Sequence, residues 1–218
     1  MDNNKAVETF LKNFTGSIDS QILNAFLKIT KVITLENKEV LFNEGDKAYY
    51  FYYVIEGNIK LSKLAEDGKE TIIRIINSND IFAEAVLFGS MAYPVNAAAI
   101  NKTILLSINI DGFQKLCAEN QNFVLKLFVT MSHQLRYLVD MINDLSSSDT
   151  TKRLMKYLKS ISETKQSNTF KLAIPKRELA MLLGAAPETI SRIFAKLQQD
   201  GYILINGKEI TILKDYIL

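Results

Sequence analysis

The sequence predicts an α+β protein in which an antiparallel β region, a long helix and a winged helix-turn-helix follow one another along the chain. Three observations support this prediction. Short strand-like segments separated by turn signals occupy residues 31–110, a heptad pattern of apolar residues covers 124–145, and two short helices joined at a glycine precede a hairpin signal at 202–213.

Composition limits the class of protein. The chain has 218 residues, of which 48% are hydrophobic and 23% charged, a balance typical of soluble globular domains. Its apolar runs are far shorter than the roughly 18 residues of a membrane helix, and the N-terminal segment MDNNKAVETF lacks the basic-then-apolar order of a signal peptide. We therefore expect a cytoplasmic protein with no membrane partner. The single cysteine, Cys117, excludes an intrachain disulfide and supplies too few thiolates for an iron–sulfur cluster or a structural zinc site.

Charge is distributed unevenly along the chain. Residues 1–149 hold 14 Lys and Arg against 18 Asp and Glu, a net charge of −4, whereas residues 150–218 hold 12 against 6, a net charge of +6. Lys and Arg supply most of the non-specific affinity for DNA by neutralising phosphates. The C-terminal third is therefore the part of the chain that favours nucleic acid.

The N-terminal part changes from a helical to a strand-like pattern. Apolar residues at helical spacing predict two short helices within the first thirty residues. Turn signals at 44–46, 56–58 and 66–68 then separate segments that predict an antiparallel barrel or sandwich. The aromatic run at 49–53 is interpreted as strand packing, because aromatic residues are good strand formers. The expected strands are Val32–Leu35, Val40–Phe42, Tyr49–Ile55, Ile59–Leu64, Thr71–Ile76 and Thr103–Ile108.

A long helix is predicted next, with one narrow apolar seam. Apolar residues at spacings of 4, 3, 4, 3, 4 and 3 favour a parallel two-helix dimer interface, the alternative being a helix that lies on the core of its own domain. The polar residues 146–149 are suited to a hinge and to capping the following helix. The seam consists of Val124, Phe128, Met131, Leu135, Leu138, Ile142 and Leu145.

The C-terminal part carries the signals of a winged helix-turn-helix. A helix is expected at Thr150–Ile161, a polar loop after it, and a second helix from Pro175 to Leu183. Gly184 breaks this helix, Pro187 begins the next one, and Gly201 ends it. The Asn206-Gly207 pair between two apolar segments is typical of a type I′ hairpin, which adds the wing.

These segments together resemble the Crp/Fnr superfamily of bacterial transcription regulators over nearly the whole chain. The resemblance lies in FNEGDKAYYFYYVIEGNIKLSKLAEDGKE (42–70), IFAEAVLF (81–88) and IPKRELAMLLGAAPETISRIFAKLQQDGYILINGKEITI (174–212). It implies a cyclic-nucleotide-binding-like β-roll, an antiparallel jelly roll, as the sensor domain at 1–118. It further implies a dimerisation helix at 119–145, a hinge at 146–149 and a winged helix-turn-helix DNA-binding domain at 150–218, with double-stranded DNA, a second copy of the chain and RNA polymerase as partners.

The helix after Pro187 carries the residues that would read DNA. In the Fnr-like branch the recognition helix has an E-x-x-S-R motif for a TTGA-type half-site, and Glu188, Ser191 and Arg192 match it. Arg192 can bond O6 and N7 of a guanine, Glu188 can accept from a cytosine amine, and Ser191 can approach a thymine. Relatives of the cyclic-AMP receptor type carry an Arg where this chain has Pro187, which favours the Fnr-like half-site. The remaining DNA-binding candidates, which would contact phosphates, are Thr189, Lys152 and Lys196.

The sensor departs from the cyclic-nucleotide binders of the superfamily. Those proteins have a GE-L motif, followed further on by Arg-Ser or Arg-Thr, in which Glu holds the ribose and Arg the phosphate. This chain has Ala83-Glu84-Ala85, and no Lys or Arg lies between Arg74 and Lys102. A buried phosphodiester without a cation costs several kcal/mol, so cyclic AMP is disfavoured as the ligand. The pocket candidates are Phe82, Glu84, Val86, Leu87, Phe88, Met91 and Tyr93, which suit a largely apolar effector.

Haem is the specific cofactor that the resemblance raises. The segment FAEAVLF is similar to that of the nitric-oxide-responsive, Dnr-type branch, which works through haem. The single histidine, His133, falls at an outer heptad position and is interpreted as a surface residue rather than an axial ligand. Cys117 is interpreted as a small buried hydrophobe.

Two functions compete with that of a DNA-binding regulator, namely an enzyme and a cyclic-nucleotide-binding interaction module. An enzyme is disfavoured, because a chain with one His offers no Ser/His/Asp or Cys/His set, and no glycine-rich phosphate loop is present. A cyclic-nucleotide-binding interaction module would lack the helix-turn-helix and its reading residues. If the protein is a DNA-binding regulator, the alternative is a cyclic-nucleotide-responsive regulator with an atypical phosphate pocket.

Overall fold

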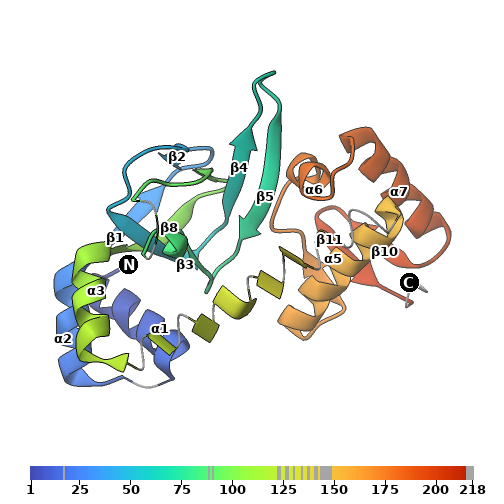
Figure 1. The fold of residues 1–218 in the computed structure, drawn as a ribbon. Helices are drawn as coiled ribbons and strands as arrows, with labels where there is room; N and C mark the ends of the chain where they lie inside the picture. Colours follow the sequence, from blue (N-terminus) through green and yellow to red (C-terminus); the bar gives the residue numbers. More distant parts are fainter. Residues whose placement is uncertain are drawn as a thin grey trace. The chain divides into compact units, whose positions relative to one another are not determined.

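The computed structural model describes residues 1–218 except 17, 88, 90, 122, 123, 126, 127, 130, 134, 137, 140, 141, 143–148 and 215–218 (Figure 1). The chain divides into two compact units, Met1–Gln134 and Leu135–Leu218.

The first unit is built on two antiparallel sheets of four strands each. One sheet has the order β1-β8-β3-β6 and the other β2-β7-β4-β5, so consecutive strands alternate between the sheets, as in a jelly roll, except for β4 and β5, which form a hairpin within one sheet. The strands are β1 (Thr30–Leu35), β2 (Val40–Phe42), β3 (Tyr50–Glu56), β4 (Ile59–Leu64), β5 (Glu70–Ile76), β6 (Ile81–Phe82), β7 (Asn96–Ala99) and β8 (Thr103–Asn109).

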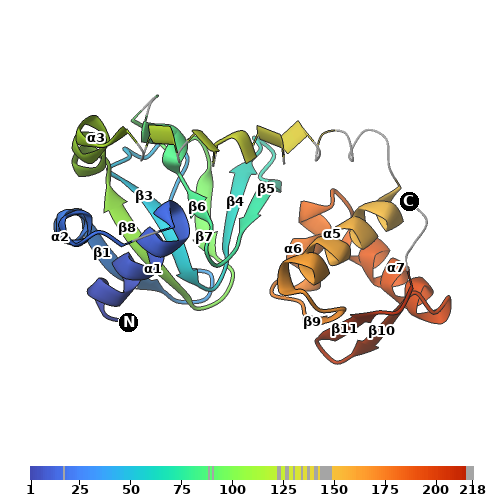
Figure 2. The same cartoon turned by 90° about the horizontal axis from the view of Figure 1, so that it is seen from below.

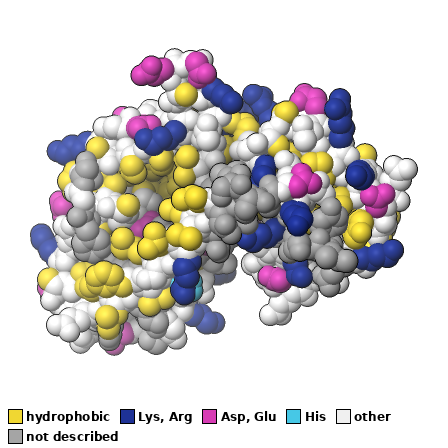
Figure 3. All heavy atoms as spheres, turned by 45° about the vertical axis from the view of Figure 1, so that its right-hand side comes forward, with side chains coloured by type: hydrophobic (Ala, Val, Ile, Leu, Met, Phe, Trp, Pro, Cys, Tyr) yellow, Lys and Arg dark blue, Asp and Glu magenta, His cyan; other side chains and the backbone are white. Residues whose placement is uncertain are grey.

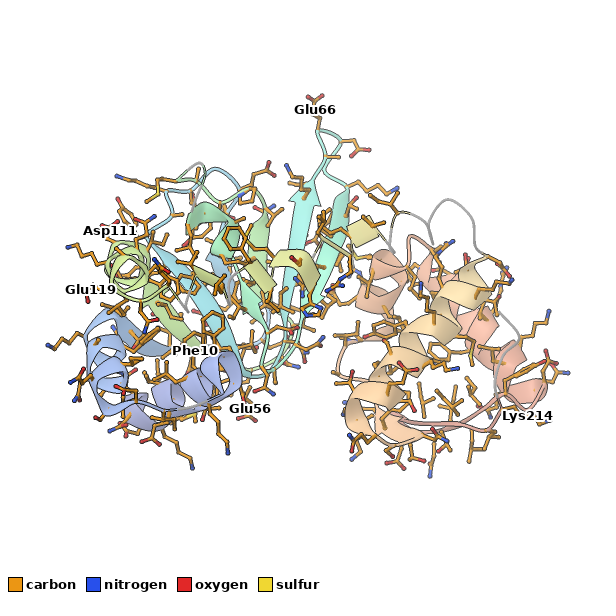
Figure 4. All side chains as sticks on the ribbon, turned by 60° about the horizontal axis from the view of Figure 1, so that its bottom comes forward. Phe10, Glu56, Glu66, Asp111, Glu119 and Lys214 are labelled. Carbon is orange, nitrogen blue, oxygen red and sulfur yellow. The ribbon has the colours of Figure 1, made fainter. Side chains whose placement is uncertain are left out.

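Helices α1 (Asn3–Thr15), α2 (Ser20–Ile29) and α3 (Ile110–Glu119) lie together at one end of the β-roll (Figure 2). Phe10 of α1 is fully buried, its ring 5.3 Å from that of Tyr53 on β3 and 5.5 Å from that of Phe26 on α2. Figure 4 shows this side chain directed into the unit, whereas Glu66 stands at the tip of the β4–β5 hairpin. The Tyr53 hydroxyl donates to Asn79 Oδ1 at 2.7 Å and accepts from Asn13 Nδ2 at 2.7 Å, which ties α1 to the sheet.

Four residues of the aromatic run at 49–53 lie in β3, as expected, and Tyr49 directly precedes this strand. Phe51, Tyr52 and Tyr53 on β3 are buried, whereas Tyr49 and Tyr50 at its start are exposed. The interpretation that these aromatic side chains pack within a strand is therefore confirmed for the buried residues.

Three strands and one α-helix were not expected from the sequence. Strand β6 has two residues and β9 (Thr169–Lys171) has three, too few to show a period, and β9 lies where a polar loop was expected. The sequence of β7 is NAAA, and Asn and Ala are depleted in strands. Helix α3 has Gly112 in its first turn, which lowers helix propensity by about 1 kcal/mol relative to Ala. The Asn109 side chain caps this helix by accepting from Gly112 N at 2.9 Å.

The second unit contains the winged helix-turn-helix. Helix α5 (Thr150–Lys165) leads through β9 to α6 (Lys176–Leu182) and α7 (Pro187–Gln199), and the hairpin of β10 (Ile203–Asn206) and β11 (Glu209–Ile212) completes a sheet of order β10-β11-β9. Gly207 has a φ of 61°, as a hairpin turn at this position requires. The predicted α+β fold, with a β-roll and a C-terminal winged helix-turn-helix, is confirmed.

The predicted dimerisation helix is described only at some residues. Those at 121, 124, 125, 128, 129, 131–133, 135, 136, 138, 139 and 142 are helical. Leu145 of the seam and residues 146–148 of the predicted hinge lie outside the described part of the chain.

Gly57, in the β3–β4 turn, permits a close approach of the chain to β8. Its φ is 95°, and a Cβ added there would lie 2.5 Å from Thr103 Oγ1 and 2.7 Å from the Lys102 carbonyl oxygen. Gly68 has a similar φ of 79°, but a Cβ there would meet nothing within 4 Å. The two positions share backbone strain and differ in steric contact.

We expect Gly57→Ala to lower the free energy of unfolding by about 3 kcal/mol, because left-handed strain and a steric clash both apply. The matched control Gly68→Ala should cost about 1 kcal/mol from strain alone. Urea unfolding of both variants checks this, and equal losses would contradict the contact at Gly57.

Candidate functional site

Helix α7 has one buried and one exposed face. Its apolar residues Ile190, Phe194 and Leu197 are at most 2% exposed and pack into the core of the second unit. The spacing of 4 and 3 puts them on one side of the helix. The opposite side, which is exposed, carries the predicted reading and phosphate-contacting residues Glu188, Thr189, Ser191, Arg192 and Lys196.

The N-terminus of α7 has no side-chain cap. Its N-cap residue, Ala186, has no side chain that can cap the helix, and Pro187 occupies the first helical position, where a missing N–H costs nothing. Ser191 Oγ donates to the Pro187 carbonyl oxygen at 3.0 Å. The single hydroxyl proton of Ser191 is therefore used within the helix, and its oxygen retains only acceptor capacity.

The turn before α7 closes in a regular helix-ending motif. Gly184, with a φ of 61°, donates its N–H to the Met181 carbonyl at 3.2 Å, and Ala185 donates to the Ala180 carbonyl at 2.9 Å. This pair of bonds is a Schellman motif at the end of α6. In addition, Lys176 Nζ lies 4.9 Å from the centre of the Phe194 ring, so α6 contacts α7 through a cation–π interaction.

Further cations lie around this helix. Lys152 of α5 is exposed, as predicted for a phosphate contact. Arg177 at the start of α6 and Lys208 at the tip of the β10–β11 hairpin are also exposed, and neither was identified from the sequence, although Lys208 directly follows the Asn-Gly turn. Figure 3 shows Lys and Arg side chains at many points over the described surface of this unit.

The predicted effector residues of the first unit lie in its core. Phe82, Val86, Leu87 and Tyr93 are at most 4% exposed, and Glu84, the first residue of the short 3₁₀ helix η1 (Glu84–Leu87), is 3% exposed. Met91 is 41% exposed, and Phe88 lies outside the described residues. Ala83 has a φ of 61°, a strained conformation for a residue with a Cβ, at the position where the cyclic-nucleotide binders have Gly.

Tyr93 belongs to a stack of aromatic rings between the two sheets. Its ring lies 3.6 Å from that of Phe42 at an interplanar angle of 9°, and the ring of Tyr52 lies 5.2 Å from that of Phe82. The Tyr93 hydroxyl donates to the Tyr50 carbonyl at 2.7 Å and lies 3.3 Å from the Tyr52 hydroxyl. Burial raises the pKa of both the Tyr52 and the Tyr93 phenols, so both stay neutral at physiological pH.

The described residues of the 121–142 helix expose a broad apolar surface. The predicted seam residues Phe128, Leu135, Leu138 and Ile142 are 39–67% exposed, Met131 is 36% exposed and Val124 is half-buried. His133 is exposed on the same helix. Three apolar side chains outside the predicted seam are also exposed: Leu125, Val129 and Val139.

Other kinds of site find little support in the described part of the chain. Cys117 is half-buried, and burial raises the pKa of its thiol, which disfavours the reactive thiolate. Across the described residues, no group of three or more His, Cys, Asp and Glu side chains could hold a metal ion. Within the same residues, no helix combines the length and the apolarity needed to cross a bilayer.

Comparison with known proteins identifies the class. Residues 32–120 match the model of the cyclic nucleotide-binding domain, and residues 152–215 match that of the Crp-like helix-turn-helix domain. The chain therefore belongs to the Crp/Fnr family of DNA-binding transcription regulators, as the sequence motifs indicated.

Individual relatives are distant but cover most of the chain. The cAMP-activated global transcriptional regulator CRP of Pasteurella multocida is 26% identical over 203 residues, which are 91% of this chain and 97% of the relative. The structure of FixK2 from Bradyrhizobium japonicum superposes with a TM-score of 0.77 at 21% identity, covering 85% of this chain and 93% of that one. The c-di-GMP responsive global regulator CLP of Xanthomonas campestris gives a TM-score of 0.74 at 23% identity, covering 90% and 100%.

Proposed function

We propose that this regulator binds a palindromic operator with TTGA-type half-sites as a homodimer. The observation that supports this most directly is the exposed face of the first two turns of α7, where an acceptor, a small hydroxyl and a bidentate donor lie together on a helix-turn-helix. Glu188 accepts from a cytosine amine, Arg192 bonds a guanine edge, and Ser191 faces a thymine. Pro187 stands where the cyclic-AMP receptor type carries an Arg, which favours the Fnr-like half-site.

Phosphate contacts position the helix without reading sequence. Thr189 and Lys196 flank the reading residues on α7, and Lys152 adds a cation from α5. A dimer would place its two recognition helices about 34 Å apart, one turn of DNA, on an operator close to TTGAT-N4-ATCAA.

Arg192→Ala should lower the preference for this operator over a scrambled duplex by about 1–3 kcal/mol per half-site, because a bidentate base contact is lost. Lys152→Ala should weaken both duplexes alike and reduce the salt dependence of binding by about one phosphate contact per half-site. Fluorescence anisotropy over a range of salt concentrations measures both effects. The half-site assignment is refuted if wild type and Arg192→Ala are equally indifferent to sequence.

The homodimer would form through the long helix. Regulators of this family are dimeric, and the described seam residues expose apolar side chains at heptad spacing. A parallel pair of helices at 119–145, between a sensor at 1–118 and a DNA-binding domain at 150–218 with a hinge at 146–149, is the domain organisation that we propose. Contact with RNA polymerase would follow from operator binding.

Replacing Leu135 and Leu138 by Lys should produce monomers, because the double variant would bury four like charges in each dimer. Operator binding should weaken greatly, because each monomer would have to bind its half-site in a separate association step. Analytical ultracentrifugation checks the assembly state. A dimer as stable as that of the wild type would place the interface elsewhere.

For the effector, we propose a molecule other than a cyclic nucleotide, bound in the β-roll near η1. The support is the absence of any Lys or Arg from the sequence between Arg74 and Lys102, together with the apolar and aromatic surroundings of Glu84. Haem, as in the nitric-oxide-responsive Dnr-type branch, is the specific candidate that the FAEAVLF segment favours, and the apolar residues Phe82, Val86, Leu87 and Tyr93 suit its ring. His133, on the long helix, is not assigned as its ligand.

A cyclic-nucleotide effector is the second candidate. It is favoured by the match to the cyclic nucleotide-binding domain, by the relative described as cAMP-activated and by the structural neighbour described as c-di-GMP responsive. It would need a cation from outside the 75–101 segment, such as Arg74 or a partner's Arg136, to neutralise the phosphate.

Isothermal calorimetry with cyclic AMP and cyclic GMP should show no saturable binding at physiological concentrations, because a buried phosphodiester would lack a cation. The variant Glu84→Ala should then bind the operator like the wild type whether or not nucleotide is present. A micromolar dissociation constant for cyclic AMP that is lost in Glu84→Ala would establish the second candidate instead.

A further inference from the structure

Arg153 of α5 differs from the lysines beside it. In the sequence it belongs to a basic group with Lys152, Lys156 and Lys159, which is typical of a phosphate-contacting surface. Its side chain is instead half-buried, and its Nε donates to the Leu183 carbonyl oxygen at 3.1 Å. Its Nη2 lies 3.0 Å from Thr150 Oγ1 in the same helical turn. The guanidinium is thus directed into the second unit.

The acceptor of this bond, Leu183, is the C-cap residue of α6. The Schellman motif satisfies the carbonyls of Ala180 and Met181 through the N–H groups of Ala185 and Gly184. The Leu183 carbonyl lies beyond the reach of that motif, and Leu183 is 7% exposed, so water is largely excluded from it. Arg153 supplies the donor, and its positive charge also complements the negative end of the α6 dipole.

The orientation of α7 depends on this turn. Only residues 183–186 separate the two helices, and Ala186 provides no side-chain cap that could fix the start of α7 independently. A change in the direction of the Leu183 carbonyl would therefore change the direction in which the start of α7 presents Glu188 and Arg192.

We propose that Arg153 is a positioning residue that clamps the turn of the helix-turn-helix and couples the first turn of α5 to the recognition helix. The proposal rests on the proposed DNA-reading role of α7. Because Thr150 and Arg153 lie in the first turn of α5, directly after the predicted hinge, a displacement of that turn would be transmitted through the Nε–carbonyl bond to Leu183. An effector-dependent movement of the hinge would in this way alter operator binding.

Three substitutions separate a clamp from a phosphate contact. Arg153→Gln places an N–H donor at the position of Nε but removes the charge. Arg153→Lys keeps the charge but moves the nitrogen beyond that position. Arg153→Met keeps the apolar stem that packs on the unit and removes the donor. Lys165→Ala, at the other end of α5, is the control for the loss of one positive charge.

Hydrogen exchange of the free full-length protein tests the clamp without DNA. We expect amides at 184–190 to exchange on the order of ten times faster in Arg153→Met, because the turn loses one charge-assisted hydrogen bond. Arg153→Gln and Lys165→Ala should remain close to the wild type. Unchanged exchange in Arg153→Met would overturn the proposal. If this variant fails to fold, the exchange rates of Arg153→Gln and Arg153→Lys are compared instead. Exchange at 184–190 should then be faster in Arg153→Lys, which lacks a donor at the position of Nε, and equal rates would overturn the proposal.

Operator binding tests the consequence for the recognition helix, with the TTGAT-N4-ATCAA duplex and its scrambled form as probes. Arg153→Met should lose about tenfold in preference for the operator at an unchanged salt slope, and Arg153→Gln should restore that preference. Loss of salt slope in Gln and Met but not in Lys, with the preference kept, would make Arg153 a phosphate contact and overturn the proposal. If the wild type itself does not prefer the operator, the proposed function fails, whereas the exchange measurement still decides whether Arg153 clamps the turn.

Discussion

The DNA-binding unit depends on the burial of one side of α7. Ile190, Phe194 and Leu197 occupy the core of this unit and so fix the rotation of the helix about its axis. With the rotation fixed, a residue four positions along from another must point the same way. Glu188 and Arg192 therefore face solvent together because of the apolar residues on the buried side of the helix. A polar substitution among these buried residues would change the direction of both exposed side chains as well as the stability of the unit.

Most of the fold could be predicted from local signals, and the failures have physical causes. Pro187 and Gly201 delimit α7 by backbone chemistry alone, and β-branched and aromatic residues mark β3 and β5. Strand β7, by contrast, has the sequence NAAA and forms only because it pairs with β2 and β4 on either side. Its existence depends on tertiary pairing, which no local pattern reveals.

The candidate sites likewise differ in how far local sequence signals predict them. The exposed positions of Glu188 and Arg192, the residues proposed to read DNA, could be predicted because a short motif places them one helical turn apart. The bond from Arg153 to the Leu183 carbonyl joins groups 30 residues apart in sequence, and an arginine among lysines gives no sign of it. In the β-roll, apolar residues around Glu84 suggested a pocket lining, but sequence does not distinguish side chains that line a pocket from side chains that fill a core. Tyr93 is 4% exposed and stacked on Phe42.

The hydroxyl groups of the aromatic stack have a defined direction. Tyr93 has a single hydroxyl proton, which it donates to the Tyr50 carbonyl, so the proton between the two phenols must come from Tyr52. The chain of donors thus runs from Tyr52 to Tyr93 to the backbone of β3. A molecule that displaced the Tyr93 ring from the β-roll would have to accept a hydrogen bond from the Tyr52 hydroxyl and donate one to the Tyr50 carbonyl. Otherwise a buried polar group would be left unsatisfied. A hydroxyl group can do both, whereas a carboxylate or a bare hydrocarbon cannot.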